Sequence, residues 1–206
     1  MTGVTRGAVP ALYVAEPSDA THRMKGNAMG FWGYLLVGRG EDRDLTECPV
    51  LAANREHLLP AGSFAGGWQL WAHPAHREPD ARPGLGGGID ALVSTLADQT
   101  AAPALAAYVM ESDCALLGGA SPGGTCWSAC LGRTPLARYL ADTGLALDDL
   151  FPSPEAAAAH CAAWAAAAGH PADTTELADV LAADPEPGVE DLFRQLLARL
   201  GMVEAG

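Results

Sequence analysis

Basic side chains are scarce in this sequence, which has one lysine, Lys25, and eleven arginines against 25 acidic residues and a net charge of −13. The shortage is greatest from residue 141 onward, where twelve acids face two bases, Arg194 and Arg199. A protein that neutralises phosphates needs the opposite balance, so nucleic acids and anionic membranes are excluded as partners. A protein partner, preferably a basic one, suits this charge, and simple solubility is the alternative explanation.

Long apolar runs and an export signal are also lacking. The first residues, MTGVTRGAVPALYVAEP, contain no apolar core followed by a cleavage site, and no run reaches the roughly 18 apolar residues of a membrane span. We therefore expect no membrane association and a cytoplasmic location. In a reducing cytoplasm the cysteines should be free thiols: Cys48, Cys114, Cys126, Cys130 and Cys161.

Motifs for metals are missing. Cys126 and Cys130 form a single C-x(3)-C pair without the second pair of a zinc site. A strand over 125–131 would hold the two thiols roughly 13 Å apart, too far for a disulfide or a shared ion. We expect Cys126, Ser128 and Cys130 to fill one face of a central strand, with Trp127 on the other face. The segment WAHPAHREPD (71–80) lacks a helical ligand spacing and is predicted to be an exposed polar loop.

Motifs that bind nucleotides are missing too, and no serine lies in the sequence context of a nucleophile. The segment GLGGGID (84–90) has neither the lysine of a phosphate-binding loop nor the glycine spacing of a dinucleotide fold. Residues 119–123 read GASPG, but we expect no nucleophile elbow there, because the turn SPGG (121–124) should join two strands and not a strand and a helix. We therefore expect no metal and no cofactor.

The residues that are present predict an α+β fold with a mixed or antiparallel sheet. Apolar segments bounded by turn residues predict the strands. In the segment GWQLWAH (67–73), Trp68 and Leu70 should lie on one face of the sheet, and Gln69 and Trp71 on the other. Ile89, Leu92, Val93 and Leu96 have the spacing of one amphipathic helix packed on this sheet. The predicted strands are 11–16, 30–38, one beginning near 57–59, 67–73, 104–110, 114–120 and 125–131.

The second half predicts a C-terminal group of about four helices. Thr134, Ser153 and Asp173 should begin three of them, and the fourth should span about 188–200. We expect a sheet domain over 1–131 and a helical region over 132–206, packed together as one unit. Whether the loops at 39–66 and 74–88 are ordered stays open.

These features favour a non-enzymatic, cytosolic protein-binding protein, of the adaptor, immunity or antitoxin kind, that docks a partner through an acidic helical surface. The residues expected to bind the partner are Trp71, Asp148, Asp149, Glu190 and Asp191. One alternative is a small enzyme of specialised metabolism with a pocket between sheet and helices. Its catalytic candidates are His73, His76, Asp113 and Cys126. A second alternative is a homo-oligomeric structural protein.

Overall fold

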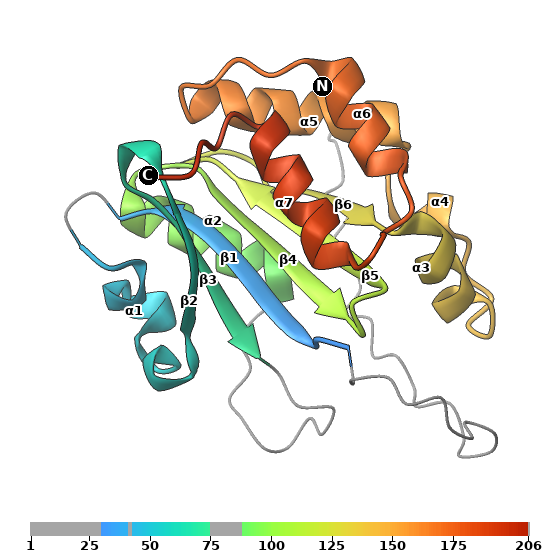
Figure 1. Cartoon of the computed structure of the whole chain (residues 1–206), viewed down its shortest axis with the longest axis horizontal. Coiled ribbons are helices and arrows are strands. Elements are labelled where there is room, and N and C mark those ends of the chain that lie inside the picture. Colours follow the sequence, from blue (N-terminus) through green and yellow to red (C-terminus); the bar gives the residue numbers. More distant parts are fainter. Residues whose placement is uncertain (1–29, 41–42, 75–87, 206) are drawn as a thin grey trace, which may run out of the picture.

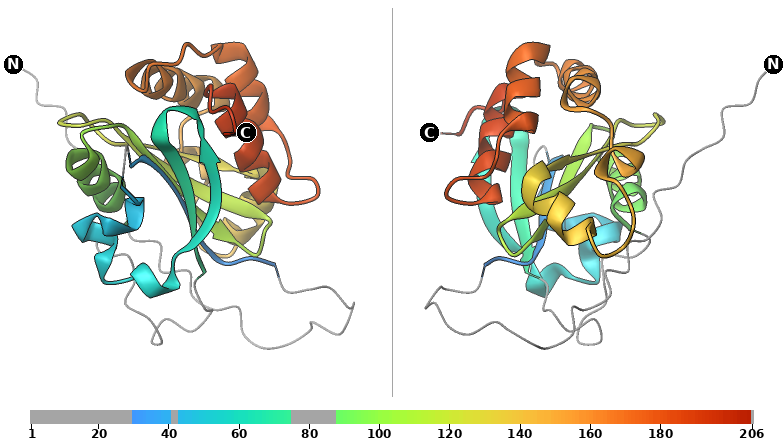
Figure 2. Two further views of the ribbon diagram at one scale, coloured as in Figure 1. Left: turned by 60° about the vertical axis from the view of Figure 1, so that its left-hand side comes forward. Right: turned by 90° about the vertical axis from the view of Figure 1, so that its right-hand side faces the viewer.

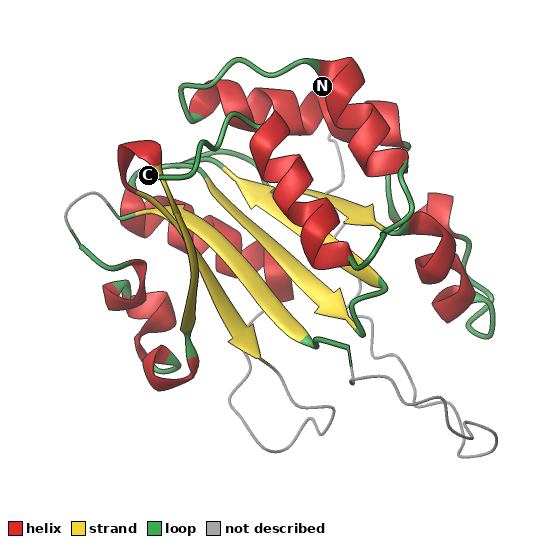
Figure 3. Ribbon diagram, in the orientation of Figure 1, coloured by secondary structure: helices red, strands yellow, loops and turns green. Residues whose placement is uncertain are grey.

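A computed structural model describes residues 30–40, 43–74 and 88–205 and confirms the α+β class. Six strands form one sheet in the order β2-β3-β1-β4-β5-β6, and every neighbouring pair is antiparallel (Figures 1 and 3). The strands are β1 (Gly33–Arg39), β2 (Leu59–Phe64), β3 (Trp68–Pro74), β4 (Ala104–Met110), β5 (Cys114–Ala120) and β6 (Trp127–Leu131). The predicted strand at 11–16 lies outside the described residues.

Helices cover both faces of the sheet, as the two turned views in Figure 2 show. On one face lie α5 (Pro154–Ala167), α6 (Thr174–Ala182) and α7 (Val189–Arg199), packed on strand residues that include Val37, Trp68 and Leu117. On the other face, α1 (Pro49–Ala52) and α2 (Gly88–Thr100) cover one part, with α3 (Arg133–Leu140) and α4 (Leu147–Leu150) over the rest.

The alternation along the strands explains this arrangement, because successive side chains point to opposite faces. Trp68 and Leu70 are buried beneath the C-terminal helices, and Trp71 packs with the cluster under α2, as predicted. Trp164 of α5 is buried, and its indole nitrogen donates a 2.9 Å hydrogen bond to the carbonyl of Ala104 in β4. This bond satisfies a buried polar group and joins the helical layer to the sheet.

Two glycines in β5 let a large side chain from a neighbouring element pack closely against each face of this strand. A Cβ at Gly118 would collide with Ile89 of α2, and one at Gly119 would collide with the indole of Trp127 in β6. The two glycines therefore permit close packing on opposite faces of the same strand.

The predicted helix starts are partly right. The Ser153 hydroxyl accepts a hydrogen bond from the amide of Ala156, and the Asp173 carboxylate accepts two, from Thr175 and Glu176. Thr134, in contrast, does not cap α3, which begins at Arg133 after Gly132 in a left-handed conformation with φ of 68°.

Other predictions needed correction. The C-terminal part holds five helices, since the one-turn helix α4 was not predicted, and residues 39–58, left open above, contain α1 and two 3-10 turns. The strand predicted to begin near 57–59 is β2. Elements of one turn show no hydrophobic period, so the pattern of the sequence does not reveal them. The strand that carries Cys130 is an edge strand, not a central one, and Cys126 precedes it and is exposed.

Candidate functional site at the acidic end of the sheet

The turn between β4 and β5 has an unusual backbone. Glu111 and Ser112 have φ of 53° and 60°, in the left-handed region that residues with a Cβ rarely adopt. The amide of Asp113 donates to the carbonyl of Met110 at 3.0 Å, which closes the turn. Two positive φ angles in succession suit the right-handed twist of the flanking strands, so the strain follows from the tightness of this hairpin.

Ser112 joins this turn to two distant segments. Its hydroxyl accepts a 2.8 Å hydrogen bond from the amide of Phe31 and donates one of 2.6 Å to Glu190 Oε1. Its carbonyl accepts the amide of Val189 at 2.8 Å, and its amide donates to the carbonyl of Phe31 at 3.1 Å. These four bonds hold the first turn of α7 and the entry to β1 against the turn, which fixes the strained conformation.

Arg133 fixes the neighbouring segment, α3–α4, in a similar way. Its guanidinium donates to the carbonyl of Pro152 at 3.0 Å and to Asp148 Oδ1 at 2.6 Å, and it contacts Cys130 Sγ at 3.6 Å. A Cβ at Gly132, the residue before it, would collide with the carbonyl of Asp113. The start of α3 therefore lies directly against the β4–β5 turn.

These contacts bring three acidic segments to one side of the molecule, at the lower right in Figure 1. We call this surface the acidic end, and it comprises residues 111–113, 133–150 and 184–191. It holds two bases, Arg133 and Arg138, against nine acids. Seven of the acids are exposed, and Glu111 and Glu190 are half-buried; the exposed ones are Asp113, Asp142, Asp148, Asp149, Asp184, Glu186 and Asp191. The arrangement favours attraction of a positively charged surface.

Four of the five residues predicted to bind a partner lie on the acidic end. Asp149 and Asp191 are exposed, Asp148 is bound to Arg133, and Glu190 is bound to Ser112. Trp71 lies elsewhere, on the sheet face that carries α2, where its indole donates to Gln69 Oε1 at 3.0 Å. Sequence reasoning missed the organising role of Ser112, because its partner in α7 is 78 residues away.

The catalytic candidates of the alternative hypothesis are separated. Asp113 and Cys126 flank opposite ends of the β5–β6 hairpin, roughly 20 Å apart at about 3.3 Å per residue. His73 is buried on β3, three strands from β5, or roughly 14 Å away. His76 lies outside the described residues. The three described groups therefore share no point at which a substrate could contact all of them.

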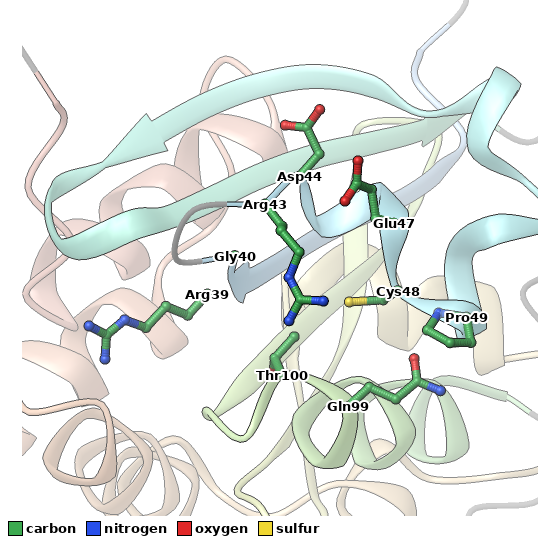
Figure 4. Close-up of a pocket in the computed structure, with 9 residues that line it drawn as sticks. All are labelled: Arg39, Gly40, Arg43, Asp44, Glu47, Cys48, Pro49, Gln99 and Thr100. Carbon is green, nitrogen blue, oxygen red and sulfur yellow. The ribbon is translucent and has the colours of Figure 1, made fainter.

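A small pocket of about 100 Å³ lies instead between the segment before α1 and the end of α2 (Figure 4). The Cys48 thiol and the Arg43 guanidinium point into it. Burial raises the pKa of Cys48, an effect that Arg43 opposes and Glu47 reinforces. Arg39 and Gln99 at its rim already bond to the backbone of Gly66 and Val50. The pocket thus holds a neutral thiol, and much of its polar rim serves the fold.

The five cysteines are free thiols, as expected. Burial raises the pKa of Cys114 and Cys161 to about 12 and that of Cys130 to about 11, the last despite the opposing effect of Arg133. These three thiols are protonated and unreactive at neutral pH. Among the described residues, no group of three or more acidic, histidine or cysteine side chains could hold a metal ion.

Comparison with known proteins gives no further guide to function. No family model matches the chain, and no curated protein or solved structure matches it. In the described part of the chain, no helix has the length and apolar character needed to cross a membrane.

Proposed function

We propose that this chain is a non-enzymatic protein-binding protein of the adaptor, immunity or antitoxin kind, which docks a basic partner protein through its acidic end. The observation that carries the proposal is the gathering of nine acids and two bases, drawn from three separate segments of the chain, on one surface. Complementary charge accelerates encounter and selects partners, and this surface has the sign and density for that role.

The rigidity of the surface supports the same proposal. Ser112 and Arg133 hold its segments through hydrogen bonds to the backbone and to Glu190 and Asp148. Carboxylates on fixed segments lose little conformational freedom when a partner binds, which reduces the entropic cost of association.

The scatter of His73, Asp113 and Cys126 also favours binding over catalysis, because acid–base and nucleophilic chemistry needs groups within hydrogen-bond reach of one another. In this proposal the protein acts in the cytoplasm, where free thiols such as that of Cys126 persist.

The test compares two variants with the same change in net charge. The first neutralises three exposed acids of the acidic end: Asp149→Asn, Glu186→Gln and Asp191→Asn. The control neutralises three exposed acids elsewhere: Asp44→Asn, Glu56→Gln and Asp179→Asn. Each protein, and the unmodified one, is used as bait in an extract of the native host, and captured proteins are identified by mass spectrometry.

We expect the unmodified chain and the control to retain one stoichiometric basic protein. The acidic-end variant should bind that protein about tenfold more weakly by calorimetry, since three peripheral charge contacts are lost. The affinity of the unmodified chain for the partner should fall as salt is added, and the affinity of the acidic-end variant should fall less steeply. Capture of no protein, or equal affinity of the two variants, would contradict the proposal. Light scattering that shows a stable homo-oligomer would favour self-association instead.

A further inference from the structure

The pocket in Figure 4 contains charged side chains that contribute little to the fold. The guanidinium of Arg43 points into it and forms no hydrogen bond or ion pair with any other described residue. The carboxylate of Asp44 also has no partner within the described part of the chain. Glu47 has only a 3.8 Å ion pair with Arg55, in which both side chains are about half exposed. One positive and two negative groups are therefore available to a ligand.

These charges meet at the pocket without neutralising one another. In Figure 4 the Arg43 guanidinium lies beside the Cys48 thiol, and the carboxylates of Asp44 and Glu47 lie apart from it. Burial is the main cause of the raised pKa of Cys48, while Arg43 lowers that pKa and Glu47 raises it further. Groups of opposite charge therefore act on the same thiol.

The formal charges of the described lining are balanced. Arg39 and Arg43 face Asp44 and Glu47 around the pocket, and its other lining side chains are uncharged. The acids at positions 41 and 42 adjoin it in the sequence and lie outside the described residues. The described lining therefore favours neither a simple anion nor a simple cation.

The end of α2 adds a partial charge of its own. Gln99 and Thr100, the last two residues of this helix, both line the pocket. The C-terminus of a helix carries a partial negative charge, which attracts an ammonium group and repels an anion. The Arg43 guanidinium has the opposite preference, and its planar shape can donate two parallel hydrogen bonds to a carboxylate. A molecule that carries both a carboxylate and an ammonium group satisfies the two preferences together.

The volume of the pocket limits the size of such a molecule. A cavity of about 150 Å³ admits benzene. The pocket, at about 100 Å³, suits a smaller molecule, of the size of glycine or alanine. In these amino acids the two charged groups are attached to the same carbon atom, which matches opposite charges that act on one thiol.

We propose that this pocket binds a small α-amino acid, whose carboxylate pairs with the Arg43 guanidinium and whose ammonium group lies toward Glu47 and the end of α2. The pocket lies beside α1, on the other side of the molecule from α3 and α4 (Figure 1). It shares no residue with the acidic end and does not depend on the function proposed for that surface.

The test titrates the unmodified protein at neutral pH with L-alanine and with two relatives that each lack one charged group, propionate and ethylamine. NMR follows the backbone amides of residues 43–48 and 99–101. Alkylation by iodoacetamide gives a second readout, because the Cys48 thiol points into the pocket and the exposed Cys126 serves as an internal control.

We expect alanine to shift these amides with a dissociation constant in the millimolar range, and to slow the alkylation of Cys48 but not that of Cys126. Propionate and ethylamine should each bind about fivefold more weakly than alanine, since each lacks one charge contact. Propionate binding as tight as that of alanine would overturn the proposal in favour of a simple anion site. Ethylamine binding as tight as that of alanine would overturn it in favour of a cation site.

Three variants test the assigned roles. Arg43→Gln should weaken alanine binding about fivefold and leave ethylamine binding unchanged, while Glu47→Gln should weaken alanine binding and leave propionate binding unchanged. Arg199→Gln, at an exposed arginine of α7 that pairs with Glu176, is the control and should bind alanine as the unmodified protein does. Equal affinity of all three variants for alanine, or no shift of the pocket amides of the unmodified protein, would overturn the proposal.

Discussion

The hydroxyl of Ser112 donates a 2.6 Å hydrogen bond to Glu190, and this bond joins a strained turn of the sheet to the first turn of α7. The two residues are 78 positions apart in the sequence. Acidic side chains near the N-terminus of a helix are favoured by its dipole, so Glu190 is stabilised where Ser112 holds it. The bond thus fixes one of the acids of the acidic end and the backbone that carries its neighbours.

We predict that Ser112→Ala destabilises the protein by about 1–3 kcal/mol, because the amide of Phe31 and the carboxylate of Glu190 each lose a partner. Urea unfolding followed by tryptophan fluorescence measures the change. Ser128→Ala, at another half-buried serine, is the control and should change the stability by less than about 0.5 kcal/mol. Equal changes in the free energy of unfolding for the two substitutions would show that the hydrogen bonds of Ser112 do not stabilise the fold more than an ordinary half-buried serine does.

A second prediction concerns the end of α2. Ala101, directly after this helix, has φ of 52°, a conformation that glycine adopts without steric cost. We expect Ala101→Gly to stabilise the protein by about 1 kcal/mol, since relief of strain exceeds the added freedom of the unfolded chain. Ala163→Gly, at an exposed position in the interior of α5, is the comparison and should destabilise by about 1 kcal/mol. A loss of stability in both variants would contradict the strain at Ala101.

Hydrophobic pattern allowed most of the larger elements to be predicted. The period of α2 and the opposite faces of Trp68 and Trp71 follow from burial, which the order of apolar residues records directly. The start of α3 was wrong because Gly132 begins it through its backbone conformation, without a side-chain cap. Local rules for capping residues do not detect such a start.

The candidate site was predictable in composition but not in arrangement. Charge counts identified Asp149 and Asp191, which are exposed on the acidic end. Their assembly with the β4–β5 turn depends on Ser112 and Gly132, whose partners lie far away in the sequence or on another strand. Trp71 was grouped with these acids although it lies on β3, near the other edge of the sheet from β5 and β6, because a count of aromatic residues carries no information on position.

A third prediction tests the close packing on β5. A Cβ at Gly119 would overlap the indole of Trp127, so Gly119→Ala should destabilise the protein by about 1–3 kcal/mol. In a Trp127→Ala background the same substitution should cost little, and the double-mutant cycle should give a clear coupling energy. Gly62→Ala is the control, since its Cβ would meet its nearest neighbours at an ordinary 3.7 Å. Additive effects of Gly119→Ala and Trp127→Ala would show that the two positions do not contact.

The last prediction concerns stability at alkaline pH. Burial raises the pKa of the thiols of Cys114 and Cys161 to about 12 and of Cys130 to about 11, from an ordinary value of 9.0. The folded protein therefore keeps these protons in a range where the unfolded chain has released them. The stabilisation is complete below about pH 9 and is lost as the pH rises toward 11–12, at up to about 1.4 kcal/mol per pH unit for each thiol.

Urea unfolding between pH 8 and pH 10.5 measures this loss. Cys161→Ala should make the decline less steep, whereas Cys126→Ala should not, because Cys126 is exposed in the folded state. The comparison between variants also removes the contribution of Tyr34 and Tyr108, whose pKa values are raised by burial as well. Labelling with a thiol reagent at pH 8 should modify Cys126 first, and Cys161 only after unfolding. Rapid labelling of Cys161 in the native protein, or identical slopes for the two variants, would contradict the burial of its thiol between α5 and the sheet.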